Sequence, residues 1–169
     1  MEDKSSTFSR NANPQSQLLG KKALDKLKII YENNNYLVIE KKAGITVNKS
    51  DTTADELTVQ DLIEKSDLID EQDFDADFVA RSGIVHRLDK ETSGVLIVAR
   101  NSKAFKNLQL QFKERRVEKS YLALVHGDLV PSSGEIAAPV GRLPWNRKRF
   151  GVLAGGREAV TKYQVLSIL

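Results

Sequence analysis

The sequence predicts an α+β domain with a mixed, largely antiparallel β-sheet and flanking helices. Three observations lead to this prediction. Short runs rich in β-branched residues are separated by polar turns, two amphipathic stretches have helical spacing, and no internal repeat is evident. The length of 169 residues suits one domain, and 40% hydrophobic residues suffice for a packed core.

The N-terminal part of the chain combines a polar arm with short strands. Residues 1–27 are rich in Ser, Asn and Gln, and we expect a flexible arm there. Two strands are expected at 28–31 and 36–39, joined by a turn at 33–35 whose three asparagines tolerate left-handed backbone. A third strand is expected at 44–47.

Helices and further strands follow. Thr58 and Asp61 mark a helix start, and residues 66–80 are expected to form an acidic connecting segment. A buried strand is expected at 95–99, and a helix capped by Asn101 comes next. The apolar face of that helix carries Phe105, Leu108 and Phe112. The remaining strands are expected at 121–126, 134–139, 150–154 and 159–169.

Composition excludes several kinds of site. The chain has no cysteine, which excludes a disulfide scaffold, a thiol nucleophile and every Cys-based metal site. Its two histidines, His86 and His126, argue against a His-rich metal centre. The longest apolar run, 95–99, is too short for a membrane span, and the first residues lack the apolar core of a secretory signal. We therefore expect a cytoplasmic protein.

Charge is unevenly distributed along the chain. Residues 1–50 carry 9 basic and 5 acidic side chains, residues 51–80 carry 1 and 11, and residues 81–169 carry 16 and 7. The net charge of +3 is therefore the sum of +4, −10 and +9. A basic half favours a polyanionic partner, and ordinary charge scatter around one acidic linker is an equal alternative.

The most informative stretch is residues 83–99, with the sequence Gly-Ile-Val-His-Arg-Leu-Asp-Lys-Glu-Thr-Ser-Gly-Val-Leu-Ile-Val-Ala. It places Asp89 in a polar turn between two apolar strands, with Arg87 and Lys90 on either side. Nearby positive charge favours the ionised carboxylate, so Asp89 is available as a nucleophile or base. A purely structural salt-bridge turn is the alternative that these residues alone leave open.

Residues 83–99 closely resemble the active-site segment of the RluA-type RNA pseudouridine synthases, which isomerise selected uridines in RNA. Residues 29–47 resemble the opening strands of that family with their Lys-Pro-x-Gly turn, and residues 117–127 resemble its second active-site segment. The resemblance spans about residues 28–169 in the right order. It implies the catalytic domain of this family and a reaction that needs no metal, nucleotide or redox cofactor.

The resemblance also implies roles for single residues. Asp89 matches the catalytic aspartate and Tyr121 the active-site tyrosine of the family. The reaction breaks the N1–C1′ glycosidic bond, turns the uracil and rejoins it through C5. The uridine has to flip out of a stem, and Arg87 is suitably placed to fill the vacated stack or hold a phosphate. His86 is expected to shape the turn beside the substrate.

Structured RNA, ribosomal or transfer, is the expected partner of a monomeric protein. Two basic clusters are candidate contacts to the RNA backbone: Lys113, Arg115, Arg116 and Lys119; and Arg142, Arg147, Lys148 and Arg149. The second cluster also contains Trp145, which either stacks on an unpaired base or lies in the core.

The sequence departs from the family pattern in two places. Lys42 stands where the family usually has proline, so the turn before Gly44 is less rigid. The family's later Thr-Gly-Arg-Thr-His-Gln-Ile-Arg-like motif, which supplies the arginine expected to pair with the aspartate, does not occur before Leu169. The last segment, 159–169, has a β-pattern with no turn after it. We therefore expect residues 28–169 to be a catalytic domain that lacks its C-terminal part.

Other functions are less consistent with these residues. A non-catalytic RNA-binding fragment, or an inactive truncated homologue, is the main alternative, and retention of Asp89 and Tyr121 argues against it for the complete protein. A kinase is disfavoured because Asp89 comes one position later than in a His-Arg-Asp loop and no Asp-Phe-Gly follows. The sequence also has no Gly-x-x-x-x-Gly-Lys-Ser/Thr phosphate loop.

Overall fold

A computed structural model describes residues 27–50, 56–66, 68–69 and 73–168. The chain forms two compact units, Met1–Lys119 and Ser120–Leu169. The polar arm expected at 1–27 lies outside the described residues except for Leu27. Among the described residues the longest helix has 12 residues, and none is long and apolar enough to cross a membrane.

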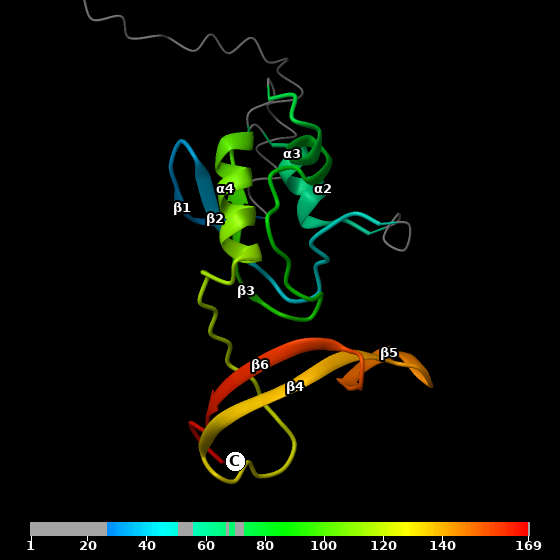
Figure 1. Cartoon of the computed structure of the whole chain (residues 1–169). Coiled ribbons are helices and arrows are strands. Elements are labelled where there is room, and N and C mark those ends of the chain that lie inside the picture. The colour runs from blue at the N-terminus through cyan, green and yellow to red at the C-terminus, as the bar shows by residue number, and fades with distance from the viewer. Residues whose placement is uncertain (1–26, 51–55, 67, 70–72, 169) are drawn as a thin grey trace, which may run out of the picture. The chain divides into compact units, whose positions relative to one another are not determined.

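The first unit contains a three-stranded antiparallel sheet of β1 (Lys28–Glu32), β2 (Tyr36–Lys41) and β3 (Gly94–Ala99), in the order β1-β2-β3 (Figure 1). The predicted asparagine turn joins β1 to β2. The Asn33 side-chain oxygen accepts hydrogen bonds from the N–H groups of Asn35 at 2.8 Å and Tyr36 at 3.0 Å. Because these bonds form within a few residues, the hairpin could be predicted from sequence.

One face of this sheet packs on helix α2 (Val59–Glu64). The core cluster there contains Leu37, Ile39, Leu96 and Val98 from the sheet and Val59, Leu62 and Ile63 from the helix. The helix begins where predicted, because Thr58 and Asp61 form a capping box. The Thr58 hydroxyl oxygen accepts the Asp61 N–H at 3.1 Å, and the Asp61 carboxylate accepts the Thr58 N–H at 2.9 Å.

The opposite face of the sheet is covered by helix α4 (Ser102–Lys113) (Figure 1). Asn101 caps this helix as predicted, its side-chain oxygen accepting the Ala104 N–H at 2.9 Å. Phe105 is fully buried and meets Phe78 edge-on, with ring centroids 5.8 Å apart. The alternating side chains of β3 therefore serve two cores, one on each face of the sheet.

The prediction of a strand at 44–47 is wrong. This segment is irregular, and its carbonyl oxygens accept hydrogen bonds from the first turn of α2. The Val59 N–H donates to Thr46 at 2.9 Å, and the Gln60 N–H donates to Val47 at 3.0 Å. Val47 is itself buried in the core. The apolar pattern of the segment thus reflects burial beside α2 and not strand pairing.

The acidic segment 66–80 is more than a connection, because it contains the start of helix α3 (Ala76–Arg81). The Asp75 side chain caps this helix by accepting the Phe78 N–H at 3.1 Å. Negative side chains favour a helix N-terminus, and Phe78 anchors the helix in the core. The prediction of a connecting segment, made from its acidic composition, therefore missed the start of this helix.

The second unit contains an antiparallel sheet of β4 (Ser133–Leu143), β5 (Asn146–Val152) and β6 (Arg157–Gln164), in the order β5-β4-β6. Three strands occur after residue 133 as predicted, but with other bounds: β4 runs on to Leu143, β5 covers Asn146–Val152 in place of 150–154, and β6 ends at Gln164. The α+β class and the antiparallel pairing are thus confirmed, as two separate sheets.

The prediction of a strand at 121–126 is also wrong. Residues 116–125 are irregular, and Leu122 is 88% exposed. A strand forms only where a neighbouring strand satisfies its backbone groups, and no strand in the described part of the chain pairs with this segment.

Candidate functional site

The chain enters the candidate site at Gly83, directly after α3. The Gly83 carbonyl accepts the Ala99 N–H at 2.8 Å, and Ile84 forms a single bridge with Val98. Gly83 has a φ of 72°, and a Cβ at this position would lie 2.1 Å from the Ala99 carbonyl oxygen. Glycine is therefore required for the chain to approach β3 this closely.

The segment from His86 to Ser93, which we call the Asp89 turn, connects this bridge to β3. Leu88 is buried, whereas Asp89 is exposed. The Thr92 N–H donates to the Asp89 carbonyl at 3.1 Å and closes the turn. The buried leucine anchors the turn, and the aspartate next to it faces solvent.

A buried lysine of β2 holds the Asp89 turn. Lys41 is 1% exposed, and its Nζ donates to the carbonyl oxygens of Lys42 at 3.0 Å, Lys90 at 2.9 Å and Thr92 at 2.7 Å. Three acceptors satisfy the three donors of an ammonium group. A buried charge is tolerated only when it is satisfied in this way, so the lysine and the turn stabilise each other.

Sequence reasoning missed Lys41, although the sequence carries a signal for it. Leu37, Ile39 and Lys41 occur at alternate positions of β2, and all three are buried. Side chains two residues apart in a strand lie on the same face. A lysine in such an inward position indicates a buried cation with partners elsewhere in the chain.

Lys41 also brings positive charge to the acidic residues of the turn. Burial lowers the pKa of Lys41, while the negative charges of Glu91 and Asp89 act in the opposite direction. These two carboxylates of the turn therefore favour the charged form of the lysine.

Neither of the two cations that flank Asp89 in sequence forms an ion pair with it in the described part of the chain. The Lys90 Nζ pairs with Glu56 at 2.9 Å. Arg87 is exposed and has no ion pair among the described residues. The alternative of a salt bridge between Asp89 and these neighbours therefore does not describe the turn.

The His86 imidazole points toward the fold. Its Nε2 accepts the Ile97 N–H at 3.0 Å, and its ring stacks on Phe112 of α4 with centroids 4.7 Å apart and 24° between the planes. Burial lowers the pKa of His86, and the positive charge of Lys119 adds to this effect. The ring of this predicted substrate contact is thus engaged by β3 and α4.

Tyr121 belongs to the second unit, where it is 64% exposed. The structure brings Asp89, Arg87 and His86 together in one turn of the first unit and adds Lys41 to them. That Tyr121 and Asp89 belong to one active site, as the resemblance implies, stays a prediction. In the described part of the chain, no three His, Asp or Glu side chains converge as metal ligands.

Comparison with known proteins identifies the family. Residues 35–169, which include the whole Asp89 turn, match the model of the RNA pseudouridylate synthase family. The chain belongs to this family. The resemblance of residues 83–99 to the RluA-type synthases is thereby confirmed.

The curated relatives of this chain are more than twice as long as the part they share with it. An uncharacterized RNA pseudouridine synthase of Aquifex aeolicus is 43% identical over 141 residues, which are 83% of this chain and 43% of the relative. Ribosomal large subunit pseudouridine synthase D of Xanthomonas campestris is 40% identical over 139 residues, 82% of this chain and 40% of the relative. The chain therefore spans less than half the length of these curated relatives.

A solved structure supports the fold of the synthase chain. Human RNA pseudouridylate synthase domain containing 1 is 27% identical, with a TM-score of 0.54, over 82% of this chain and 50% of that one.

The basic residues expected to contact RNA occur in both units of the chain. Arg115, with a φ of 56°, and Arg116 follow α4, and Arg116 pairs with Glu114 at 2.7 Å. Lys113 and Lys119 are exposed near them in sequence.

In the second unit, β4 and β5 form a hairpin whose tip carries Trp145. Trp145 is 77% exposed, so the alternative of a tryptophan in the core is wrong. The Arg142 guanidinium lies over the Phe150 ring, 4.8 Å from its centroid, and donates to the Arg147 carbonyl at 2.7 Å. Successive strand residues face opposite sides, so Lys148 shares the side of Phe150 while Arg147 and Arg149 face the other. The basic cluster therefore surrounds the hairpin.

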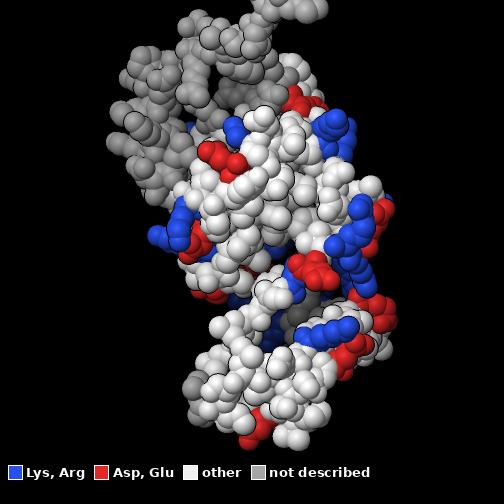
Figure 2. All heavy atoms as spheres, turned by 90° about the vertical axis from the view of Figure 1, so that its left-hand side faces the viewer, with Lys and Arg blue, Asp and Glu red and all other residues white. Residues whose placement is uncertain are grey.

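On the face drawn in Figure 2, the described residues do not repeat the charge segregation of the sequence. Figure 2 shows basic and acidic side chains lying next to one another on the same face. The ion pairs Lys90–Glu56, at 2.9 Å, and Lys106–Asp75, at 2.6 Å, join basic residues of 81–169 to acidic residues of 51–80.

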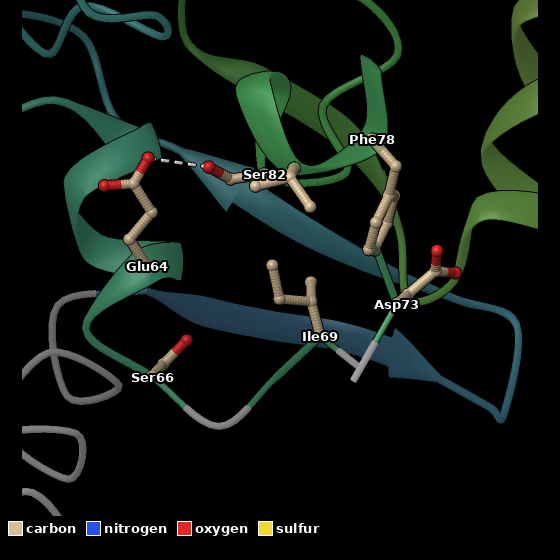
Figure 3. A pocket seen from close by; sticks show the side chains of 7 residues that line it. Glu64, Ser66, Ile69, Asp73, Phe78 and Ser82 are labelled. Atoms are coloured by element: carbon tan, nitrogen blue, oxygen red, sulfur yellow. Dashed lines mark hydrogen bonds between the residues drawn. The ribbon is translucent and has the colours of Figure 1, made fainter. Parts of the chain in front are cut away.

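A pocket of about 310 Å³ in the first unit contains none of the predicted site residues (Figure 3). It is lined by Glu64, Ser66, Ile69, Asp73, Phe78, Val79 and Ser82. Its acids are already engaged, since Glu64 accepts the Ser82 hydroxyl at 2.7 Å and Asp73 accepts the Ser102 N–H at 2.6 Å. We therefore place the candidate site at the Asp89 turn.

Proposed function

We propose that the complete protein isomerises specific uridines in ribosomal or transfer RNA to pseudouridine, with Asp89 as the catalytic carboxylate. One observation carries the proposal. In a chain of the RNA pseudouridylate synthase family, an exposed aspartate stands on a turn whose backbone is fixed by the buried ammonium of Lys41. A catalytic group must be held in place while remaining accessible to substrate, and Asp89 meets both conditions.

The proposed reaction balances without a further reactant. The N1–C1′ bond breaks, a C5–C1′ bond forms, C5 loses a proton and N1 gains one. Asp89 supplies the carboxylate that acts on the sugar or the base, and no cofactor is required. Tyr121 stacks on the uracil and helps to remove the C5 proton.

RNA binding in this proposal combines base flipping with contacts to phosphates. Extruding the uridine costs a few kcal/mol, and the planar guanidinium of Arg87 fills the vacated stack or holds a phosphate. The exposure of Arg87 and its lack of an ion pair among the described residues support this role. The further phosphate contacts are Arg115, Arg116, Lys119, Arg147, Lys148 and Arg149. The proposal includes the cytoplasmic location and the RNA processing role expected from sequence.

The test compares two neighbouring carboxylates in the full-length protein. Asp89→Asn keeps the shape of the side chain and removes its charge, so we expect release of tritium from uridine C5 to be abolished while RNA binding changes little. Glu91→Gln is the matched control, because Glu91 is also exposed and also near Lys41, and it should retain turnover.

Normal turnover by Asp89→Asn would sink the catalytic assignment. If the wild-type protein binds RNA but releases no tritium, the alternative of a non-catalytic RNA-binding protein replaces the synthase.

A further inference from the structure

Two backbone N–H groups of β3 are satisfied in different ways by the chain that enters the Asp89 turn. The Ala99 N–H donates to the Gly83 carbonyl at 2.8 Å, as in a strand pair. The Ile97 N–H, two residues earlier, donates to His86 Nε2 at 3.0 Å. The His86 side chain thus accepts the Ile97 N–H in the way that the Gly83 carbonyl accepts the Ala99 N–H.

The imidazole acts where the chain leaves β3. The bridge between Ile84 and Val98 is isolated, and residues 85–93 form no strand. The chain is free to turn away at this point because His86 already satisfies the Ile97 N–H. Leu88 and Asp89 follow within three residues, so the direction in which the chain departs determines where the carboxylate stands.

The geometry requires a neutral imidazole. Nε2 accepts a hydrogen bond only when it is unprotonated, which places the ring proton on Nδ1. The stack on Phe112 fixes the plane of the ring. His86 therefore connects β3, α4 and the Asp89 turn through one side chain.

We infer that His86 is a positioning residue for Asp89. Its neutral imidazole holds the first residues of the Asp89 turn against β3. Protonation of the imidazole breaks this hydrogen bond, frees the first residues of the turn and lowers turnover in acid. The inference rests on the proposed catalytic function of Asp89, and it gives His86 no contact with the reacting atoms.

The charges around His86 favour the neutral ring. β3 carries no titratable side chain, and α4 contributes Phe112, with Lys113 next to it. Burial and the positive charge of Lys119 lower the pKa of His86. On the turn itself, Arg87 adds positive charge and Asp89 negative charge. Protonation would add a second cation to a site that already feels the positive charge of Lys119, and it would turn an N–H group toward the Ile97 N–H.

The first experiment measures the hydrogen bond itself, through amide hydrogen exchange at Ile97. His86→Leu keeps apolar contact with Phe112 but has no acceptor, and we expect exchange about tenfold faster. His86→Gln brings an amide oxygen near the position of Nε2 and should keep the protection. His126→Gln, an exposed residue of the second unit, is the control and should change nothing. Equal Ile97 protection in His86→Leu and wild type would overturn the inference.

The second experiment measures uridine isomerisation against pH in the full-length protein. We expect wild type to lose kcat in acid with little change in KM, and His86→Gln to lack that loss because its amide does not titrate. An identical fall in acid for both proteins would overturn the inference, and this holds even if His86→Leu does not fold. Asp89→Asn separates the two claims, since it should abolish turnover and leave Ile97 protected.

Discussion

The ammonium of Lys41 donates a 2.9 Å hydrogen bond to the carbonyl oxygen of Lys90, the residue that follows Asp89. A second bond, of 2.7 Å, reaches the carbonyl of Thr92. The Gly44 N–H adds a third link at 2.8 Å to the same Lys90 carbonyl. The backbone beneath the proposed catalytic carboxylate is therefore held by residues that are far away in sequence.

Replacing Lys41 with methionine should loosen the Asp89 turn. The substitution keeps much of the side-chain volume but removes the ammonium that donates to the carbonyls of Lys42, Lys90 and Thr92. Hydrogen bonds from a charged group contribute about 1.5–3 kcal/mol each, and the Lys90 carbonyl keeps the Gly44 N–H as a donor. We expect the free energy of unfolding of the first unit to fall by about 2 kcal/mol, measured by urea denaturation.

The matched control for this variant is Lys42→Met. It removes the same charge from the next residue, whose side chain is exposed, and should change stability by less than about 0.5 kcal/mol. An equal loss of unfolding free energy in both variants would show that the lost stability comes from the lysine charge and not from the hydrogen bonds of Lys41.

Alanine at position 83 should be poorly tolerated. Its Cβ would meet the Ala99 carbonyl oxygen at 2.1 Å, and this oxygen belongs to the backbone of β3, so it cannot move aside as a flexible side chain could. We expect a loss of about 3 kcal/mol or more in the free energy of unfolding. Gly44→Ala isolates the cost of positive φ, because Gly44 has a φ of 85° and nothing within 4 Å of an added Cβ. That variant should lose only about 1 kcal/mol. Equal losses would contradict the steric explanation.

Asp61 should make α2 sensitive to acid. Burial alone would raise the pKa of Asp61, but hydrogen bonds from Thr58 and the ammonium of Lys49 lower it to about 2. The folded state thus binds this proton more weakly than the unfolded state. The stability it contributes is present above about pH 4 and is lost as pH falls toward 2. In urea titrations, the difference between wild type and Asp61→Asn should shrink over this range. A difference that stays constant from pH 2 to 7 would argue against the linkage.

The exposed tip of the β4–β5 hairpin should contribute to RNA affinity by stacking. Trp145→Ala should weaken binding by about 1–3 kcal/mol per stacked base with little effect on the salt dependence. Arg147→Ala should instead reduce the slope of log affinity against log salt by about 1. Val160→Ala, an exposed apolar residue of β6, is the control. Unchanged affinity in Trp145→Ala, measured by filter binding at several salt concentrations, would remove Trp145 from the RNA surface.

Tyr121→Phe should separate stacking from proton transfer. The phenylalanine ring still stacks on uracil but has no hydroxyl, so we expect release of tritium from C5 to slow by about 10²–10⁴-fold with folding retained. Tyr31→Phe, a half-exposed tyrosine of β1, should turn over normally. An unchanged rate in Tyr121→Phe would leave stacking as the role of this residue.

Local signals in the sequence predicted much of the first unit. The Asn33 turn, the Thr58 capping box and the Asn101 cap each depend on hydrogen bonds between residues no more than three apart. Such bonds form wherever the local sequence occurs, so they could be predicted without knowing the fold.

Two segments were wrongly predicted to be strands, since no neighbouring strand in the described part of the chain pairs with them. Residues 44–47 and 121–126 have the composition of strands, yet the first lies beside the start of α2 and the second is exposed. β-propensity describes how a side chain suits a pleated surface, and it does not supply the neighbouring strand.

The amino-acid sequence by itself determined which residue is the candidate carboxylate, because the run from Gly83 to Ala99 is distinctive enough to indicate its family. Only the tertiary structure decided which basic side chain holds the turn that carries this carboxylate. Arg87 and Lys90 are adjacent to Asp89 in the chain, but Lys90 pairs with Glu56, and the turn is held by Lys41. Hydrogen bonds between residues far apart in the chain depend on which segments pack together, and the sequence around the turn does not show this packing.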